Sequence, residues 1–260
     1  MLEQSDRAGS HDEMDSGVTG WIKCCLLGVM SLCLHVAAAE PAVRLLTEND
    51  PPFNYPNEHG GVTGISTEMV TETFRRAGIP YSIEIMPWLR AYNLAQVDSK
   101  TCLYSTTRND EREKRFQWVG PLLKNDWAVF AGPRSPPGVQ DMAALKSFSI
   151  GGYRGDAVAL YLQNRGYKIE YTSDDVLNLR KLMAGHIDFW ASGIYHAHFL
   201  AEHERLGPLR QVATFSSSYL YLACHPQTPP ATLARLSAAL DAMRHDGFID
   251  ALKKRYLTPP

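Results

Sequence analysis

The sequence predicts an α/β fold with two lobes. Strand-like and helix-like segments alternate along the chain from residue 42, and this order is typical of parallel sheets covered by helices. The alternation starts again after a break rich in proline and glycine at residues 132–138. A chain of 260 residues, 45% of them hydrophobic, is long enough for two such units. These observations together favour two consecutive lobes.

The first unit is expected to contain three strands and two helices. A turn-rich loop, Asp50-Pro51-Pro52-Phe53, follows the first strand. The first helix has apolar residues at helical spacing and stops at Gly78, a common C-terminal signal. The expected elements are strand 43–46, helix 66–77, strand 81–85, helix 88–96 and strand 101–105.

The second unit repeats the pattern after the break. Gly166 and Gly185 each follow a segment with helical spacing and mark its end. The expected elements are strand 148–151, helix 156–165, strand 168–171, helix 174–184 and strand 187–191. A strand at 219–224 and an amphipathic helix at 230–244 close the chain.

Residues 1–39 are interpreted as a secretory signal peptide. Cys24 to Ala39 is an uncharged and mostly apolar run that ends in three alanines. It is shorter than the ~20 residues that span a bilayer as a helix, so export with cleavage near Ala39 is expected, with a membrane anchor as the alternative. Two cysteines remain after cleavage, Cys102 and Cys224, and the sequence leaves open whether they pair.

Composition and motifs exclude several classes of function. The 26 basic and 28 acidic residues give a formal net charge of −2. The chain therefore lacks the excess of positive charge that is typical of nucleic-acid-binding proteins. No zinc-type cysteine spacing and no nucleophile motif occur, so neither a zinc site nor a catalytic triad is expected, and nothing in the sequence implies a cofactor. His196, His198 and His203 lie close in sequence, and we interpret them as a solvated helix surface rather than as metal ligands.

Seven short motifs occur in a fixed order along the chain. They are residues 46–55, 64–69, 87–91, 105–113 followed by 116–121, 152–156, 182–188, and 246–247 with 253–256. The most specific is Ser-Thr-Thr-Arg-Asn-Asp-Glu-Arg-Glu, followed by Phe-Gln-Trp-Val-Gly-Pro. In these motifs the chain resembles the extracytoplasmic solute-binding proteins of ABC importers, in the group that takes polar amino acids and related small solutes.

The resemblance implies a periplasmic-binding-protein-like (type II) fold, in which two hinge strands join two α/β lobes around a ligand. Lobe 1 would comprise residues 42–123 plus 220–260, and lobe 2 residues 128–214. The hinge strands would lie at 124–127 and 215–219. Closure of such lobes excludes water, which strengthens every polar contact with the ligand.

The resemblance also implies a carboxylate-binding arginine, and the matching residue is Arg112. A guanidinium donates two parallel charge-assisted hydrogen bonds to a carboxylate. Thr107 matches the threonine whose hydroxyl joins that contact. Arg108 is a second cation in the same turn, which either reaches the ligand or pairs with Asp110.

Aromatic rings are expected to line the cleft, because a flat apolar wall desolvates a ligand while its polar ends stay paired. The candidates are Phe53, Tyr55 and Trp88. Each of these rings could instead belong to the ordinary core. Trp88 follows a proline at a strand-to-helix turn, and this position favours a place in the cleft.

The second lobe departs from the pattern of the family at two positions. Arg154 and Asp156 belong to the turn whose backbone N–H groups receive a carboxylate in the family, and Asp156 replaces the usual Ser or Thr. Gly193 stands where the family has the aspartate that binds the ligand's amine. Asp50 or Glu48 could take over that role.

The expected function is therefore capture of a small carboxylated solute, an amino acid or a related compound, for an ABC permease. The protein is expected to be a monomer and not an enzyme. One alternative is an exported cyclohexadienyl-type dehydratase on the same fold, with Glu48, Asp50 or Asp156 as its general acid. The other is a sensory module that contacts a membrane receptor.

Overall fold

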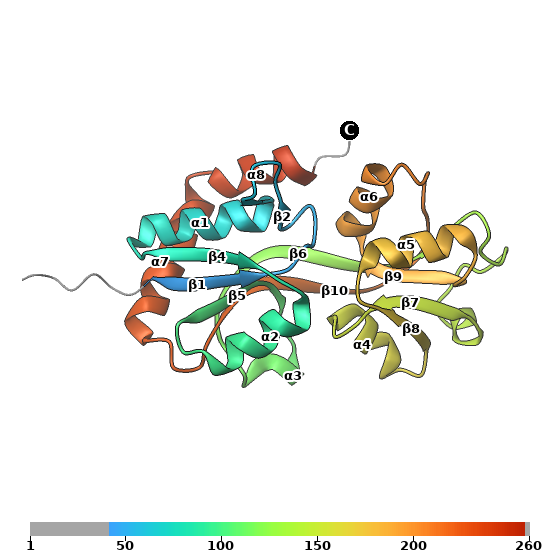
Figure 1. Cartoon of the computed structure of the whole chain (residues 1–260), viewed down its shortest axis with the longest axis horizontal. Coiled ribbons are helices and arrows are strands. Elements are labelled where there is room, and N and C mark those ends of the chain that lie inside the picture. The colour runs from blue at the N-terminus through green and yellow to red at the C-terminus, as the bar shows by residue number, and fades with distance from the viewer. Residues whose placement is uncertain (1–41, 258–260) are drawn as a thin grey trace, which may run out of the picture. The chain divides into compact units, whose positions relative to one another are not determined.

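Two long strands connect the parts of the structure, β6 (Gln117–Ala131) and β10 (Arg210–Cys224). They pair antiparallel from end to end and run between two groups of elements (Figure 1). The computed structural model describes residues 42–257, so the predicted signal peptide and the cleavage near Ala39 lie outside the described residues. None of the helices within residues 42–257 has the length and apolar character needed to cross a membrane.

The first group of elements lies beside one end of the long strands. In it β1 pairs parallel with both β4 and β5, and β5 pairs antiparallel with β10. Its main elements are β1 (Val43–Thr47), α1 (Ile65–Ala77), β4 (Tyr81–Ile85), α2 (Trp88–Val97), β5 (Thr101–Thr107), α7 (Pro230–His245) and α8 (Phe248–Leu257). A small ladder of β2 (Tyr55–Pro56) and β3 (Val62–Thr63) and the short α3 (Asp110–Glu113) complete it.

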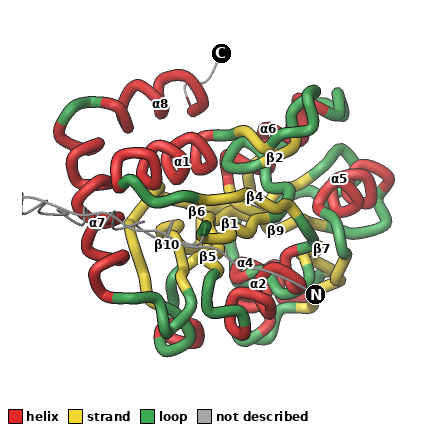
Figure 2. The backbone as a smooth tube through the Cα atoms, turned by 60° about the vertical axis from the view of Figure 1, so that its left-hand side comes forward, coloured by secondary structure: helices red, strands yellow, loops and turns green. Residues whose placement is uncertain are grey.

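Helices cover both faces of this part of the sheet. Neighbouring residues of a strand point to opposite faces, so adjacent residues of β1 pack against different helices. Leu45 of β1 packs in a core with residues of α1, α7 and α8, whereas Leu46 packs with Trp88 and Ala91 of α2 on the other face. Figure 2 shows the strands between these helical layers. The loop that follows β1 is therefore held at the edge of a firmly packed sheet.

The second group of elements lies beside the other end of the long strands. Here β7 pairs parallel with β8 and β9, and β9 pairs antiparallel with β6. Its elements are a short 3-10 turn (Ala144–Ser147), β7 (Ser149–Tyr153), α4 (Ala157–Gln163), β8 (Lys168–Thr172), α5 (Asp175–Ala184), β9 (Phe189–Gly193) and α6 (Ile194–His203). Val129 of β6 packs on the α4 side, and Phe130 packs on the side of α5 and α6.

The predicted α/β class is confirmed, with a correction to the sheet. The sequence indicated parallel units, but eight of the ten strands in residues 42–257 form one mixed sheet with the order β4-β1-β5-β10-β6-β9-β7-β8. Within this sheet the antiparallel pairs all involve β6 or β10, which are much longer than the segments expected from the sequence.

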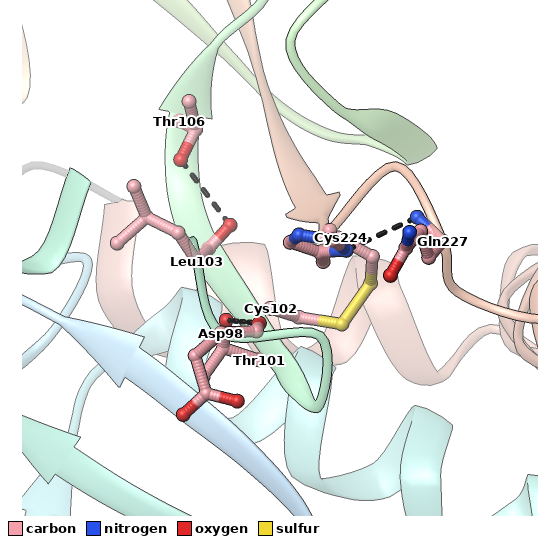
Figure 3. Close-up of a disulfide and its surroundings, with 8 residues drawn as sticks. Asp98, Thr101, Cys102, Leu103, Thr106, Cys224 and Gln227 are labelled. Carbon is pink, nitrogen blue, oxygen red and sulfur yellow. Dashed lines mark hydrogen bonds between the residues drawn. A yellow bond between two sulfur atoms is a disulfide. The ribbon is translucent and has the colours of Figure 1, made fainter. Parts of the chain in front are cut away.

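Cys102 of β5 and Cys224 of β10 form a disulfide (Figure 3). The two residues are direct partners in the register of these antiparallel strands. The bond therefore fixes the last residue of β10 to the first group of elements. The pairing that the sequence left open is present in this structure.

Reduction of this disulfide is expected to destabilise the protein. The bond closes a loop with a sequence separation of 122 residues. Loop-closure entropy for a loop of that length stabilises the folded state by up to about 5 kcal/mol. Thermal melts with and without dithiothreitol measure the effect, and the Cys102→Ser, Cys224→Ser double variant serves as the control insensitive to reductant. Equal melting temperatures for the oxidised and reduced protein would contradict this prediction.

Candidate functional site

A cavity of about 330 Å³ lies where the two groups of elements meet. Residues after β1 and β4 line it from the first group, and residues after β7, β8 and β9 line it from the second. Within each group these strands are parallel, so their carboxyl ends come together at one edge of the sheet. Ligand sites of open α/β sheets lie outside the carboxyl ends of the strands.

The cavity is rich in acidic groups. Its charged and amide side chains include Glu48, Asp50, Asn125, Asp156, Asp174, Asp175 and His196. Its apolar side chains are Phe53, Pro56, Ile85, Met86, Pro87 and Val158. Of the described residues, no arginine or lysine belongs to the lining.

His196 lies in the first turn of α6 and is buried, with 6% of its surface exposed. Its Nδ1 lies 2.7 Å from Oδ1 of Asp50, and its Nε2 lies 3.4 Å from Oδ2 of Asp175. Burial lowers the pKa of His196, but the two carboxylates outweigh it and hold that pKa well above its ordinary value. The two carboxylates, which come from different groups of elements, thus favour the protonated form of this side chain.

Burial also raises the pKa of two carboxyl groups of the cavity, Glu48 and Asp156. Burial, together with the charges of Asp50 and Asp156, raises the pKa of Glu48 well above its usual value, and Tyr153 donates a hydrogen bond to this carboxylate. Burial and the nearby Asp175 raise the pKa of Asp156 to about 6, although Arg112 acts in the opposite direction. Both groups would be ionised more readily with an additional positive charge in the cavity.

Arg112 is buried beside the cavity but is not part of its lining. Its guanidinium donates to the carbonyl oxygens of Thr107 at 3.4 Å and of Gly155 at 3.2 Å. It lies 5.1 Å from the Trp88 ring centroid and 5.2 Å from that of Tyr92, which are distances of cation–π contacts. Because Gly155 belongs to the other group of elements, Arg112 joins the two groups.

Five of the residues singled out in the sequence line the cavity: Glu48, Asp50, Phe53, Asp156 and Gly193. Phe53 is also fully buried in the core with α1. Trp88 lies next to the site, where its Nε1 donates to the Gly155 carbonyl at 2.9 Å. The contacts of these residues with a ligand stay predictions.

The remaining predicted residues lie outside the lining. Thr107 is buried on β5, Arg154 is exposed, and the Tyr55 ring packs against Phe199 of α6 at a centroid distance of 5.6 Å. Of the two alternatives for Arg108, pairing with Asp110 is not what the structure shows, and contact with a ligand stays a prediction. Arg108 instead forms two hydrogen bonds with Glu113, at 2.8 and 2.6 Å.

Gly193 ends β9 where the amide of Asn125 packs against it. A Cβ added to Gly193 would lie 2.6 Å from Oδ1 of Asn125, which is closer than atoms can approach. The aspartate usual in the family therefore has no room at this position unless Asn125 moves.

Sequence reasoning missed Asn125 and His196 as parts of the site. The expected solvated surface is wrong for His196, which is buried, and correct for His198 and His203, which are exposed. The signal that could have identified His196 is its place at the start of the helix that directly follows β9. Among residues 42–257, no group of three or more His, Cys, Asp or Glu side chains could hold a metal ion.

Replacing Asp50 by asparagine is expected to lower the pKa of His196 and to weaken binding of an amine-bearing solute. The folded-state pKa of His196 lies above its ordinary value, so its protonation stabilises the fold at pH below 6.5, and this contribution is lost as the pH rises through the elevated pKa. NMR titration of the His196 ring measures the first effect, and calorimetry measures the second. An unchanged pKa, or an unchanged affinity for the amine, would refute the role given to Asp50.

Residues 43–259 match the family described as bacterial extracellular solute-binding proteins, family 3. The chain belongs to this family. A curated relative is the L-cystine-binding protein TcyJ of Escherichia coli strain K12, which is 23% identical over 143 residues, 53% of this chain and 53% of TcyJ. The chain thus spans about half the length of the curated relatives it matches.

Solved structures confirm the fold of this family 3 protein. A histidine kinase sensor domain with similarity to periplasmic binding proteins superimposes with a TM-score of 0.78 at 21% identity, covering 84% of this chain and 97% of that domain. An ancestral arginine-binding protein bound to arginine gives a TM-score of 0.76 at 18% identity, covering 85% and 100%. The predicted two-lobed, periplasmic-binding-protein-like fold is therefore correct.

Proposed function

We propose that this protein is an exported solute-binding protein that traps one small polar solute, an amino acid or a related compound, in the cavity. Membership of the extracellular solute-binding family supports this proposal. The observation that carries it is the cavity itself, because both groups of elements line it with polar side chains. A site of this kind encloses its ligand when the two groups approach each other.

The long strands β6 and β10 supply a hinge in this proposal. Residues 124–127 and 215–219 would bend, with residues 42–123 plus 220–260 as lobe 1 and residues 128–214 as lobe 2. In support, Ser216 and Tyr219 pair with Trp127 and Lys124 at the middle of the long ladder. Contacts between the lobes, such as Arg112 with Gly155, would form on closure.

The proposed partner is an ABC permease, which the closed monomer would contact from the periplasm. The likeness to a histidine kinase sensor domain favours a second candidate, a ligand-sensing module for a membrane receptor. Both functions need the same closure on a ligand. They differ in the protein that recognises the closed state.

A thermal-shift screen of amino acids, organic acids and amines tests the proposal with protein that starts at Glu40. A solute that binds only the folded protein raises its melting temperature, by more as its concentration exceeds Kd. We expect saturable binding of at least one solute, recovered chemically unchanged. Absence of any shift across the screen would refute solute binding, and conversion of the solute would favour the dehydratase.

A further inference from the structure

We infer that the cavity holds a small organic cation without a carboxylate, such as a diamine or an amine that carries a guanidino group. This inference rests on the proposed function and names the chemical class of its ligand. It differs from the carboxylated solute expected from the sequence. Four features of the cavity support it: its excess of acidic groups, the partners of its cationic groups, an unpaired amide oxygen, and its apolar wall.

Acidic groups outnumber cationic ones at the cavity. Five acidic side chains line it, against the single imidazole of His196, and the raised pKa of Glu48 favours its neutral form until a cation enters the cavity. Arg112 is the cationic neighbour just behind the lining, and carboxylates remain in excess even with this charge included. A cation in the cavity would restore the balance, whereas an anion would face like charges at short range.

The cationic side chains nearest the cavity already have partners. His196 lies between Asp50 and Asp175, at 2.7 and 3.4 Å. Arg112 donates to the carbonyl oxygens of Thr107 and Gly155. A ligand carboxylate would have to displace one of these contacts before it found a charged donor.

Two helix N-termini at the cavity are capped by carboxylates of the chain itself. Asp156 accepts a hydrogen bond from the backbone N–H of Val158 at 3.1 Å at the start of α4, and Asp174 accepts one from Val176 at 2.7 Å at the start of α5. N–H groups at the start of a helix are the usual donors to an anion. At these two helices the protein's own anions take that place.

One residue of the lining also carries an unpaired acceptor. Asn125, on β6, is only 8% exposed and belongs to the lining. Its Oδ1 has no hydrogen-bond partner within the described part of the chain. A buried acceptor without a donor is costly, and an ammonium or guanidinium N–H is the group that would satisfy it.

The rest of the wall suits a methylene chain. Phe53, Ile85, Met86 and Val158 supply apolar surface beside the carboxylates. A solute with cationic ends and an aliphatic middle would pair its ends and bury its methylene groups. The volume of about 330 Å³ lies in the range of pockets for small ligands.

Two pairs of compounds that differ only by a carboxylate test this inference. Agmatine is arginine without its carboxylate, and cadaverine is lysine without its carboxylate. Calorimetry with the protein that starts at Glu40 measures all four Kd values at pH 7.5. We expect each amine to bind at least about tenfold more tightly than its amino acid, because the additional carboxylate meets an acidic wall.

A matched pair of variants tests whether the amine binds in this cavity. Glu48→Gln removes a lining carboxylate and is expected to weaken binding of the tighter amine by at least about tenfold. Glu58→Gln removes the same charge from an exposed loop residue and is expected to leave Kd unchanged. Equal Kd values for the Glu48→Gln variant and the unmodified protein would overturn the inference.

Failure of the inference can be distinguished from failure of the proposed function. If arginine binds more tightly than agmatine, or if only anionic solutes bind, a carboxylate subsite exists, at Arg112 or at the uncapped start of α6. The inference would then be overturned while solute binding stands. If none of the four compounds and no solute of the wider screen binds, both the inference and the proposed function are wrong.

Discussion

The Arg112→Met variant is expected to lose about 3 kcal/mol of unfolding free energy, because charge-assisted hydrogen bonds contribute about 1.5–3 kcal/mol each and cation–π contacts add to them. The substitution removes the donor to the carbonyl oxygens of Thr107 and Gly155. It also removes the guanidinium that lowers the pKa of Asp156, so that pKa would rise further. Urea unfolding at pH 7 measures the loss.

The matched control for this variant is Arg154→Met, in the neighbouring turn after β7. Arg154 is exposed, so its replacement is expected to change the unfolding free energy by less than about 0.5 kcal/mol. Arg112→Lys keeps a positive charge and is expected to lose less than Arg112→Met. Equal stabilities for Arg112→Met and Arg154→Met would contradict the role of Arg112 as the contact between the two groups of elements.

Gly193→Ala is expected to weaken solute binding at least about tenfold, because a displaced Asn125 amide would lose the ligand contact proposed for it. The added methyl group would lie 2.6 Å from Oδ1 of Asn125 and would force that amide out of place. Overpacking of a buried site also costs about 1–3 kcal/mol of unfolding free energy. Calorimetry and urea unfolding measure the two effects.

Gly61→Ala is the control for this substitution. Gly61 lies in an exposed turn, and its only close neighbour is the side chain of Asn57. An exposed side chain can move aside, so stability and binding are expected to stay within error. If the Gly193→Ala variant bound solute as tightly as the Gly61→Ala variant, the proposed contact between Asn125 and the ligand would be refuted.

The sequence predicted the elements whose signals are local. Glycines at the ends of helices gave correct boundaries, as at Gly78 and Gly185, which both adopt left-handed backbone angles. The strand expected at 81–85 is present with these bounds. The full lengths of β6 and β10 were missed, because their pairing joins residues far apart in the chain and leaves no short-range period.

The site was predicted only in part for the same reason. Asp50, Phe53 and Asp156 sit in turns that the motifs mark, and these residues line the cavity. Asn125 carries no local signal, and the place of His196 just after β9 does not show its partners, because their roles depend on contacts with Gly193 and Asp50 across long sequence separations. Spacing alone also could not show that Arg112 turns its guanidinium toward backbone carbonyls.

A crystal structure with the solute that raises the melting temperature most tests the central claim most directly. The account predicts the solute inside the cavity, in contact with Glu48 and Asn125 and enclosed by both groups of elements. A solute bound anywhere else on the protein, with this cavity left vacant, would contradict the account.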